Sequence, residues 1–138
     1  MYEYSRDVFY YETDTMGVVH HSNFVRWLEE ARIGYYASIG VPYADMEAEG
    51  VLSPIIGIDV RFKYFARFGD RFTVRLCMAK YTGVRYRVEY TVVNQRGNVL
   101  LEAESVHAFV NRDYRPVSLS KAVPFMHKGI QAAMAQQD

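Results

Sequence analysis

The stretch SNFVRWLEEARIGYYASIG, residues 22–40, decides the fold, because its apolar residues repeat at the spacing of an α-helix over several turns. Spacings of three and four separate its large apolar residues, which are Phe24, Trp27, Leu28, Ala31, Tyr35 and Ile39. This predicts a helix of about four turns with one apolar face. Ser22 is the predicted N-cap, and Gly40 followed by Pro42 predicts the end of the helix. Gly34 either marks the close approach of another backbone or is tolerated at about 1 kcal/mol relative to alanine.

On both sides of this helix the apolar residues alternate, which predicts strands. The first expected strand covers residues 4–11, with Val8 and Tyr10 on one face, and a loop over 13–22 follows it. After a short helical segment at 43–49, further strands are expected at residues 56–64, 71–78, 85–92 and 99–110. The connections between the strands that follow residue 55 are too short for crossover helices, so the sheet should be antiparallel.

The last strand and the tail carry weaker patterns. The apolar parity of the strand shifts from Leu101 and Ala103 to residues 106–110, which predicts a β-bulge near Glu104 and Ser105. The tail begins at about residue 117, and its apolar residues between 125 and 134 fit a terminal amphipathic helix.

One long apolar-faced helix and about five antiparallel strands with one apolar face each predict an α+β fold in which the sheet curls around the helix. Such a small sheet has open edges, which proteins usually pair or cover, so a homodimer or homotetramer is expected. The length of 138 residues and an apolar content of 50% predict a single domain spanning residues 1–138.

Composition excludes several classes of partner. Sixteen basic residues balance sixteen acidic ones, so charge does not favour nucleic acid. The single cysteine, Cys77, cannot form an internal disulfide, and no stretch resembles a signal peptide or a membrane span. A soluble, cytoplasmic protein without membrane insertion is expected.

The segment YYETDTMGVVHHSNFVRWLEEAR, residues 10–32, resembles the hotdog-fold thioesterases of the 4-hydroxybenzoyl-CoA thioesterase superfamily. Within that superfamily it is most similar to the small bacterial acyl-CoA thioesterases associated with the Tol-Pal system. A weaker resemblance lies in YFARFGDRFTV, residues 64–74, and the order of elements extends the likeness to about residue 111. The resemblance implies a hotdog fold and hydrolysis of an acyl-CoA.

The same resemblance implies roles for three catalytic positions. Asp14 matches the catalytic carboxylate of the family, acting as nucleophile or as general base. His21 matches the position whose backbone N–H polarises the thioester carbonyl, and Gly17 lies where the family's loop turns around the acyl group. The chain departs from the commonest pattern by having Glu12 in place of Asp and Phe24 in place of Tyr.

Elementary chemistry supports this interpretation. Attack on a thioester places negative charge on the carbonyl oxygen, which free N–H groups at a helix N-terminus can stabilise. Asp14 lies on the loop that leads into that terminus and can activate water or attack directly. The structural alternative for Asp14 is an Asx turn that only organises the loop.

A larger set of residues is expected to contact the substrate. The family string and the adjoining segments supply the candidates His20, Val19, Asn23, Phe24, Glu29 and Arg67. One of the two adjacent histidines either hydrogen-bonds within the loop or lines the pocket. Glu29 either pairs with Arg32 on the helix or faces the site of a partner subunit. A row of basic residues between 61 and 87 either meets the phosphates of coenzyme A or forms a solvated sheet face.

The sequence disfavours several functions other than hydrolysis of an acyl-CoA. A metal site formed by Asp14, His20 and His21 is disfavoured, because adjacent histidines point in different directions. The sequence has no G-x-S-x-G elbow and no phosphate-binding glycine motif. A dehydratase should carry its acid on the helix, whereas a non-catalytic module that binds acyl-CoA or acyl carrier protein would need no Asp14. No cofactor is expected, since coenzyme A belongs to the substrate.

Overall fold

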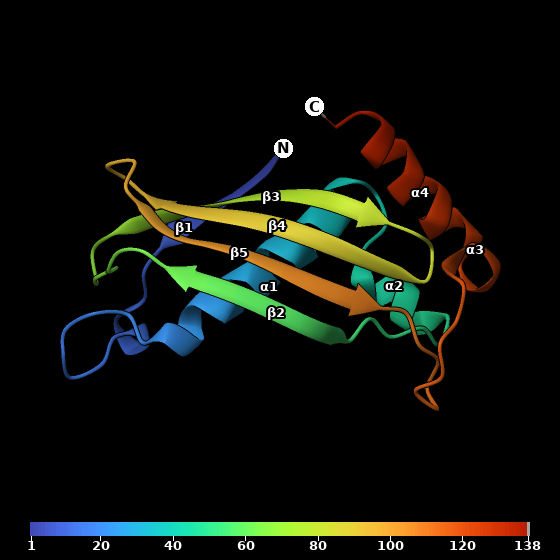
Figure 1. Cartoon of the computed structure of the whole chain (residues 1–138), viewed down its shortest axis with the longest axis horizontal. Helices are drawn as coiled ribbons and strands as arrows, with labels where there is room; N and C mark the ends of the chain where they lie inside the picture. Colours follow the sequence, from blue (N-terminus) through green and yellow to red (C-terminus); the bar gives the residue numbers. More distant parts are fainter. Residues whose placement is uncertain (138) are drawn as a thin grey trace.

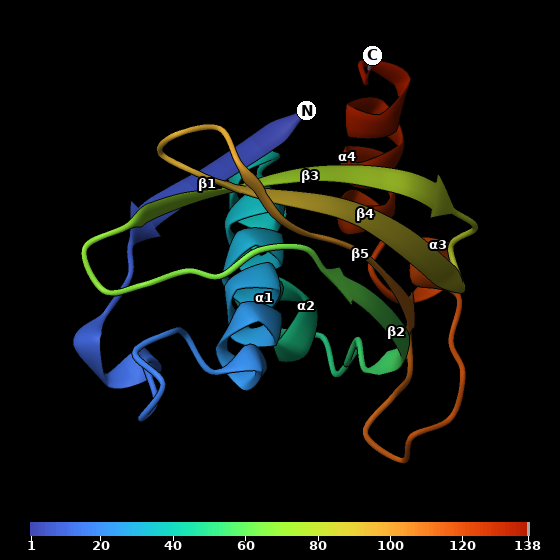
Figure 2. The ribbon, with the colours of Figure 1, turned by 60° about the vertical axis from the view of Figure 1, so that its left-hand side comes forward.

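The structure, a computed structural model, describes residues 1–137 and has the predicted α+β architecture, with a sheet that curls over one long helix (Figure 1, Figure 2). The strands are β1 Tyr2–Asp7, β2 Ile55–Phe62, β3 Arg71–Tyr81, β4 Arg85–Asn94 and β5 Val99–Ala108. The helices are α1 His21–Ser38, α2 Tyr43–Ala48, α3 Leu119–Ala122 and α4 Pro124–Ala135, with a 3-10 turn, η1, at Tyr10–Glu12. Neighbouring strands are all antiparallel in the order β1-β3-β4-β5-β2.

Helix α1 is stabilised by burial of its apolar stripe against the concave face of the sheet, as the spacing of its apolar residues predicted. Trp27 is fully buried, and its ring stacks on Phe72 of β3 at 3.7 Å. The predicted N-cap is wrong by two residues. The helix begins at His21, and the N-cap is His20, whose Nδ1 accepts a hydrogen bond from the Ser22 N–H at 3.3 Å.

Gly34 allows a close contact, although with a side chain and not with another backbone. A β-carbon at this position would overlap the hydroxyl of Tyr2, whose ring packs edge-on against Tyr35 at 5.9 Å. The glycine therefore lets β1 approach the middle of α1.

The first strand is shorter than predicted. It ends at Asp7, and the chain then turns through η1, so that Val8 is buried while Tyr10 is exposed. The alternating pattern continues past Asp7 in the sequence, but the strand ends there because the chain turns to bury Glu12 beside Arg6.

Strand β2 has the predicted alternation but not the predicted burial. It lies at one edge of the sheet, where Phe62 meets Phe24 at the start of α1, yet Ile56, Ile58 and Phe62 are 48%, 43% and 52% exposed. Val60 of the same strand packs against the core, but residues 1–137 supply no layer that buries Ile56 and Ile58.

The predicted bulge in β5 is misplaced. The register shifts at Leu100, between the pairs Val92–Leu101 and Val93–Val99, and not near Glu104. The inward parity then continues through Ser105 and His107, which are fully buried. Sequence periodicity treated these polar residues as outward-facing, and this produced the false shift to residues 106–110.

A file of hydrogen bonds satisfies Ser105 and the Nε2 atom of His107 inside the core, whereas His107 Nδ1 has no partner within residues 1–137. Arg32 donates to the Tyr90 hydroxyl at 3.1 Å, that hydroxyl bonds Ser105 Oγ at 2.6 Å, and Ser105 Oγ bonds His107 Nε2 at 2.8 Å. Burial, with the nearby Arg32 charge, lowers the pKa of His107 to about 3. The imidazole is therefore neutral at physiological pH.

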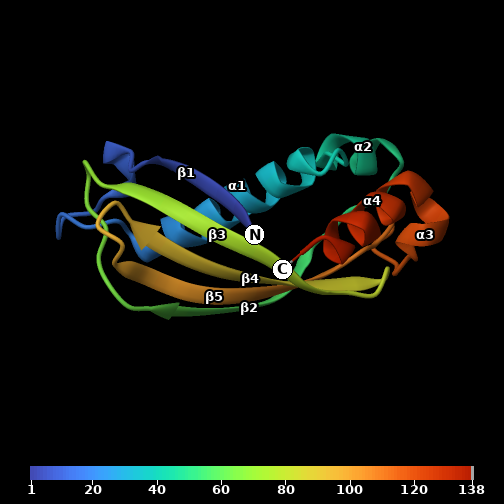
Figure 3. The same ribbon diagram turned by 90° about the horizontal axis from the view of Figure 1, so that it is seen from above.

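The tail forms α3 and α4, which lie beside the end of the sheet, so the terminal helix is confirmed (Figure 3). Met126 and Ile130 of α4 are fully buried and join the core cluster. The Gln137 side chain bonds both backbone groups of Met78, at 3.1 and 2.8 Å. None of the helices within residues 1–137 is long and apolar enough to cross a membrane.

Candidate functional site

The loop between η1 and α1 is a small, closed hairpin. Thr13 pairs with Val19 in an antiparallel bridge, and the Asp14 N–H donates to the Val18 carbonyl at 3.0 Å. Gly17 turns the loop at φ 78°, a left-handed conformation that favours glycine, and its N–H donates to the Asp14 carbonyl at 3.0 Å. The loop therefore holds Asp14 in a defined backbone conformation.

Two further contacts fix this loop to the rest of the fold. The Val19 N–H donates to the Ala66 carbonyl at 2.8 Å, which ties the loop to the segment joining β2 and β3. The Glu12 carbonyl accepts the His20 N–H and the Asn23 side-chain amide, both at 2.9 Å. The start of the loop, its end and the first turn of α1 thus meet at Glu12.

A pocket of about 310 Å³ opens between the loop, the start of α1 and the end of β2. Its lining is largely apolar and consists of Asp14, Met16, Val18, Val19, His21, Phe24, Phe62, Lys63, Tyr64 and Phe65. The rings of Phe24 and Phe62 contact each other in its wall, with centroids 5.7 Å apart. A mostly apolar cavity with a few convergent polar groups is the usual form of a small-molecule site.

Asp14 is the carboxylate in this lining. Its Oδ1 accepts the Met16 N–H at 2.9 Å, which is the Asx turn considered from the sequence. Its second oxygen has no hydrogen-bond partner within residues 1–137. The turn therefore orients the carboxylate and leaves one oxygen available for water or substrate.

The first helical residue, His21, brings the N-terminus of α1 to the same pocket. Its N–H has no acceptor in the described part of the chain, so it remains one of the free donors that every helix N-terminus carries. The rings of His20 and His21 lie side by side, with centroids 4.2 Å apart, so the expectation that they point in different directions is wrong, although their contacts differ. His20 bonds Ser22 Oγ at 2.8 Å through Nδ1 and caps the helix, whereas the His21 ring lines the pocket.

The structure does not bring every predicted contact residue to this pocket. Val19 and Phe24 line it, but Asn23 is buried against the Glu12 carbonyl. Glu29 and Arg67 are exposed and lie outside the pocket lining of this chain.

Four lining residues at the end of β2, from Phe62 to Phe65, were not predicted as part of the site. The alternating pattern assigned Phe62 and Tyr64 to a buried sheet face. No pattern within one strand could show that α1 would start beside this strand end.

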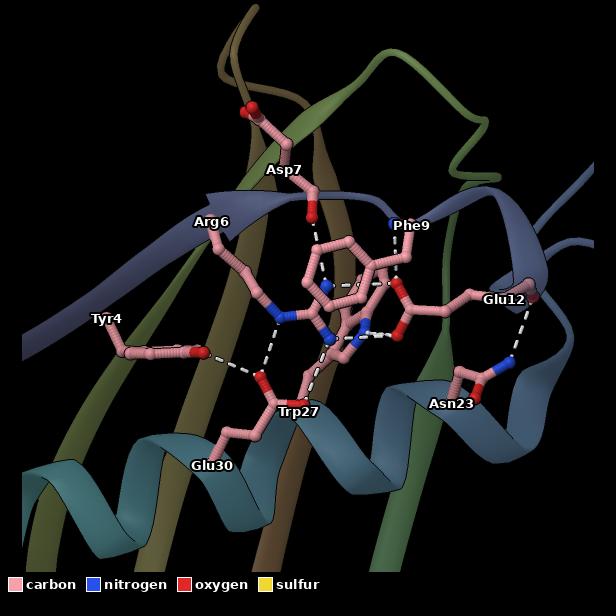
Figure 4. A network of polar contacts seen from close by, with 8 residues as sticks. All are labelled: Tyr4, Arg6, Asp7, Phe9, Glu12, Asn23, Trp27 and Glu30. Atoms are coloured by element: carbon pink, nitrogen blue, oxygen red, sulfur yellow. Dashed lines mark hydrogen bonds and ion pairs between the residues drawn. The ribbon is translucent and has the colours of Figure 1, made fainter.

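A second cluster adjoins the loop and was also missed (Figure 4). Arg6 of β1 forms ion pairs with Glu12 at 2.8 Å and with Glu30 of α1 at 2.7 Å. Burial alone would raise the pKa of Glu12, but hydrogen bonds from Arg6, Trp27 and the Phe9 N–H outweigh it, so this pKa lies below its usual value. Both carboxylates are consequently ionised at neutral pH, since the pKa of Glu30 is lowered in the same way despite its own burial.

The basic row has two kinds of members. Arg61, Arg71, Arg75 and Arg87 pair with carboxylates on neighbouring strands. Lys63, Arg67, Lys80 and Arg85 form no ion pair within residues 1–137. Of these, Lys63 is the one that lines the pocket, where it is available to an anionic ligand.

No three His, Cys, Asp or Glu side chains in residues 1–137 are grouped so that they could hold a metal ion. The side chains that line the pocket, together with the start of α1, offer one carboxylate, one imidazole, one ammonium group, the Tyr64 hydroxyl and a free helix N-terminus. This set suits attack on an acyl carbon, because it offers a base or nucleophile together with donors for a developing oxyanion.

Comparisons with known proteins agree with this chemistry. The family model described as "Thioesterase-like superfamily" matches residues 8–134. The Bacillus subtilis protein named "Putative acyl-CoA thioesterase YneP" is 33% identical over 128 residues, which are 92% of this chain and 93% of that protein. A 1,4-dihydroxy-2-naphthoyl-CoA hydrolase of Thermosynechococcus vestitus is 28% identical over 114 residues, 82% of this chain and 78% of that protein.

Solved structures give the same result. The crystal structure of a DHNA-CoA thioesterase from Staphylococcus aureus matches with a TM-score of 0.92 and 28% sequence identity, covering 97% of this chain and 91% of that one. The match extends over the sheet, α1 and the C-terminal helices.

Proposed function

From the premise that this chain belongs to the thioesterase-like superfamily and is a thioester hydrolase, we propose that it cleaves an acyl-CoA into a free acid and coenzyme A. The fold of the family, the hotdog fold, is the one predicted from the sequence. The observation that carries the proposal is the meeting of the Asp14 carboxylate and the free N-terminus of α1 at one apolar pocket. That two relatives are named for CoA thioesters supports the choice of substrate.

The two polar groups supply both halves of the reaction. As a general base, Asp14 takes a proton from water while the water oxygen bonds to the thioester carbonyl carbon. The negative charge that develops on the carbonyl oxygen is stabilised by the His21 N–H and the dipole of α1. The carbon–sulfur bond then breaks, and the leaving thiolate takes the proton from Asp14. As a nucleophile, Asp14 would instead expel the thiolate and form an anhydride, which water hydrolyses.

The pocket fits a short or aromatic acyl group. Its volume of about 310 Å³ is small, and its walls include Phe24, Phe62, Tyr64 and Phe65. Lys63 lines the pocket without a carboxylate partner within residues 1–137 and is the first candidate to bind the phosphates of the nucleotide, with the unpaired Arg67, four residues further along the chain, as the second. Trp27 and Tyr35, which could have been aromatic pocket residues, belong to the core instead.

Release of free thiol from a panel of acetyl-, benzoyl- and palmitoyl-CoA tests this function. Thiol release above the uncatalysed rate is expected, with benzoyl-CoA or acetyl-CoA giving a higher kcat/KM than palmitoyl-CoA, because the pocket is short and aromatic. Thiol release from an acyl carrier protein loaded with the same acyl groups is measured in parallel. Binding of acyl-CoA without any thiol release would instead support the alternative, a non-catalytic binding module.

The exposed face of β2 supports a homodimer as the working form. The outer edge of β2 has no strand partner within residues 1–137, and its Ile56 and Ile58 are about half exposed. Phe62 ends the same strand and lines the pocket. A second copy seated along β2 would cover this face and close the pocket from the open side.

Ile58→Lys is expected to convert the dimer to a monomer, because it places a charge on the face that pairing would bury. Size-exclusion chromatography with light scattering measures this directly. Phe125→Lys on α4 is the matched control, since Phe125 is 48% exposed and Ile58 is 43% exposed, and it should leave the mass unchanged. A native protein that is monomeric at assay concentration would contradict the dimer.

A further inference from the structure

Glu12 is an acid buried beside the proposed catalytic loop, two residues before Asp14. Its side chain is 3% exposed and accepts four hydrogen bonds. Arg6 provides two of them, at 3.0 and 2.8 Å, while the Phe9 N–H and Trp27 Nε1 each donate at 2.8 Å. A carboxylate taken out of water is expensive unless it is paired in this way. Its position is therefore defined from β1, η1 and α1 at once.

Arg6 is as completely engaged as its partner. Nε and Nη2 donate to Glu30 at 2.7 and 3.0 Å, Nη1 and Nη2 donate to Glu12, and Nη1 also donates to the Asp7 carbonyl at 2.9 Å. All five guanidinium N–H donors are used, four of them in two forked pairs and the fifth on the Asp7 carbonyl (Figure 4). The guanidinium lies 4.1 Å from the centre of the Phe9 ring. Such a fork fixes orientation as well as distance, which a point charge does not.

The backbone of Glu12 extends this fixed position to the reacting groups. Its carbonyl accepts the His20 N–H and the Asn23 amide, so Glu12 is tied to the start of α1. The loop that carries Asp14 leaves from Glu12 and returns to it at His20. The distance between the Asp14 carboxylate and the His21 N–H therefore depends on where Glu12 is held.

We propose that Glu12, held by Arg6 and through it by Glu30, is a positioning residue that sets Asp14 against the N-terminus of α1. This rests on the proposed function, in which those two groups act on one thioester. Stability alone gives little reason for the cluster, because replacing a buried ion pair by apolar residues is often neutral or stabilising. Positioning does give a reason, since a displacement of about 1 Å at a reacting group can reduce the rate by about 10²-fold.

Glu12→Gln tests the proposal, because it keeps the size of the side chain but places an amide where Arg6, Trp27 and Phe9 all donate. We expect kcat for benzoyl-CoA to fall by about 10- to 100-fold while KM stays within about threefold. If Glu12 acts through Asp14, the double variant Glu12→Gln/Asp14→Asn should be no slower than Asp14→Asn alone. Glu3→Gln is the matched control, since Glu3 of β1 pairs with Arg75 of β3 on the surface and is not part of the cluster.

The outcomes separate the two proposals. If Asp14→Asn is slow but Glu12→Gln keeps the native kcat, or if the two losses multiply in the double variant, the positioning role is wrong and the proposed function stands. If Asp14→Asn keeps the native kcat, the proposed role of Asp14 fails. Should Glu12→Gln not fold, as judged by thermal unfolding, Arg6→Lys replaces it. Lysine keeps the charge but not the fork, and a native kcat in a folded Arg6→Lys protein would likewise overturn the proposal.

Discussion

Replacing Asp14 by Asn is expected to lower kcat for acyl-CoA hydrolysis by about 10²-fold or more, because the base or nucleophile is removed from the pocket. The substitution should remove the charge without changing the loop conformation. Asp14 Oδ1 accepts the Met16 N–H, and an asparagine carbonyl can accept the same bond, so the Asx turn survives. Thiol release at saturating benzoyl-CoA, with circular dichroism to confirm the fold, measures the effect.

Asp113→Asn is the control for this experiment. Asp113 is exposed, lies outside the pocket lining, and undergoes the same chemical change. It should keep kcat within about twofold, as surface changes away from the site usually do. Equal activity of Asp14→Asn and the native protein would show that the carboxylate takes no part in the chemistry.

Replacing Arg6 by Met is expected to lower the free energy of unfolding by about 3–5 kcal/mol at pH 7, because it leaves Glu12 buried without its cation. The pH dependence should also change sign. In the native protein the pKa of Glu12 is lowered, so its contribution to stability is present above about pH 4.5 and is lost as pH falls through the folded pKa. Without Arg6, burial dominates and raises that pKa, so the variant gains stability as pH falls.

Urea unfolding at pH 7 and pH 5 measures both effects. The difference in free energy of unfolding between the native protein and Arg6→Met should be smaller at pH 5 than at pH 7. The double variant Arg6→Met/Glu12→Gln should be more stable than Arg6→Met, since no buried charge remains at position 12. Arg75→Met is the control, because Arg75 and Glu3 are exposed and such pairs contribute about 1 kcal/mol or less. If Arg6→Met lowers the free energy of unfolding no more than Arg75→Met does, the prediction is wrong.

The sequence predicted the fold class because its strongest signals are local and regular. Helix α1 is long, and each turn presents an apolar residue, so its existence did not depend on tertiary context. The wrong predictions concern features that depend on contacts with other elements. His20 caps α1 with an imidazole nitrogen, which capping preferences do not anticipate, and β5 buries Ser105 and His107 because Arg32 and Tyr90 meet them from other elements.

The candidate site was predictable only in part. Asp14, Gly17 and His21 fall within one continuous string, so resemblance could identify them together. The opposite wall, from Phe62 to Phe65, is more than forty residues away and is brought near by the sheet. Arg6 and Glu30 could not be found at all, because each looks like an ordinary exposed charge on its own strand or helix.

The file of hydrogen bonds from Arg32 to His107 also has a consequence for folding. If β5 slid by one residue against β4, Ser105 and His107 would turn to the outer face, and the guanidinium would lose the chain of acceptors that begins at Tyr90. A misregistered sheet would thus contain an ionised group among apolar side chains, which is a penalty that purely hydrophobic strands do not impose. The polar interior therefore selects one alignment of this hairpin among those that the apolar pattern alone would permit.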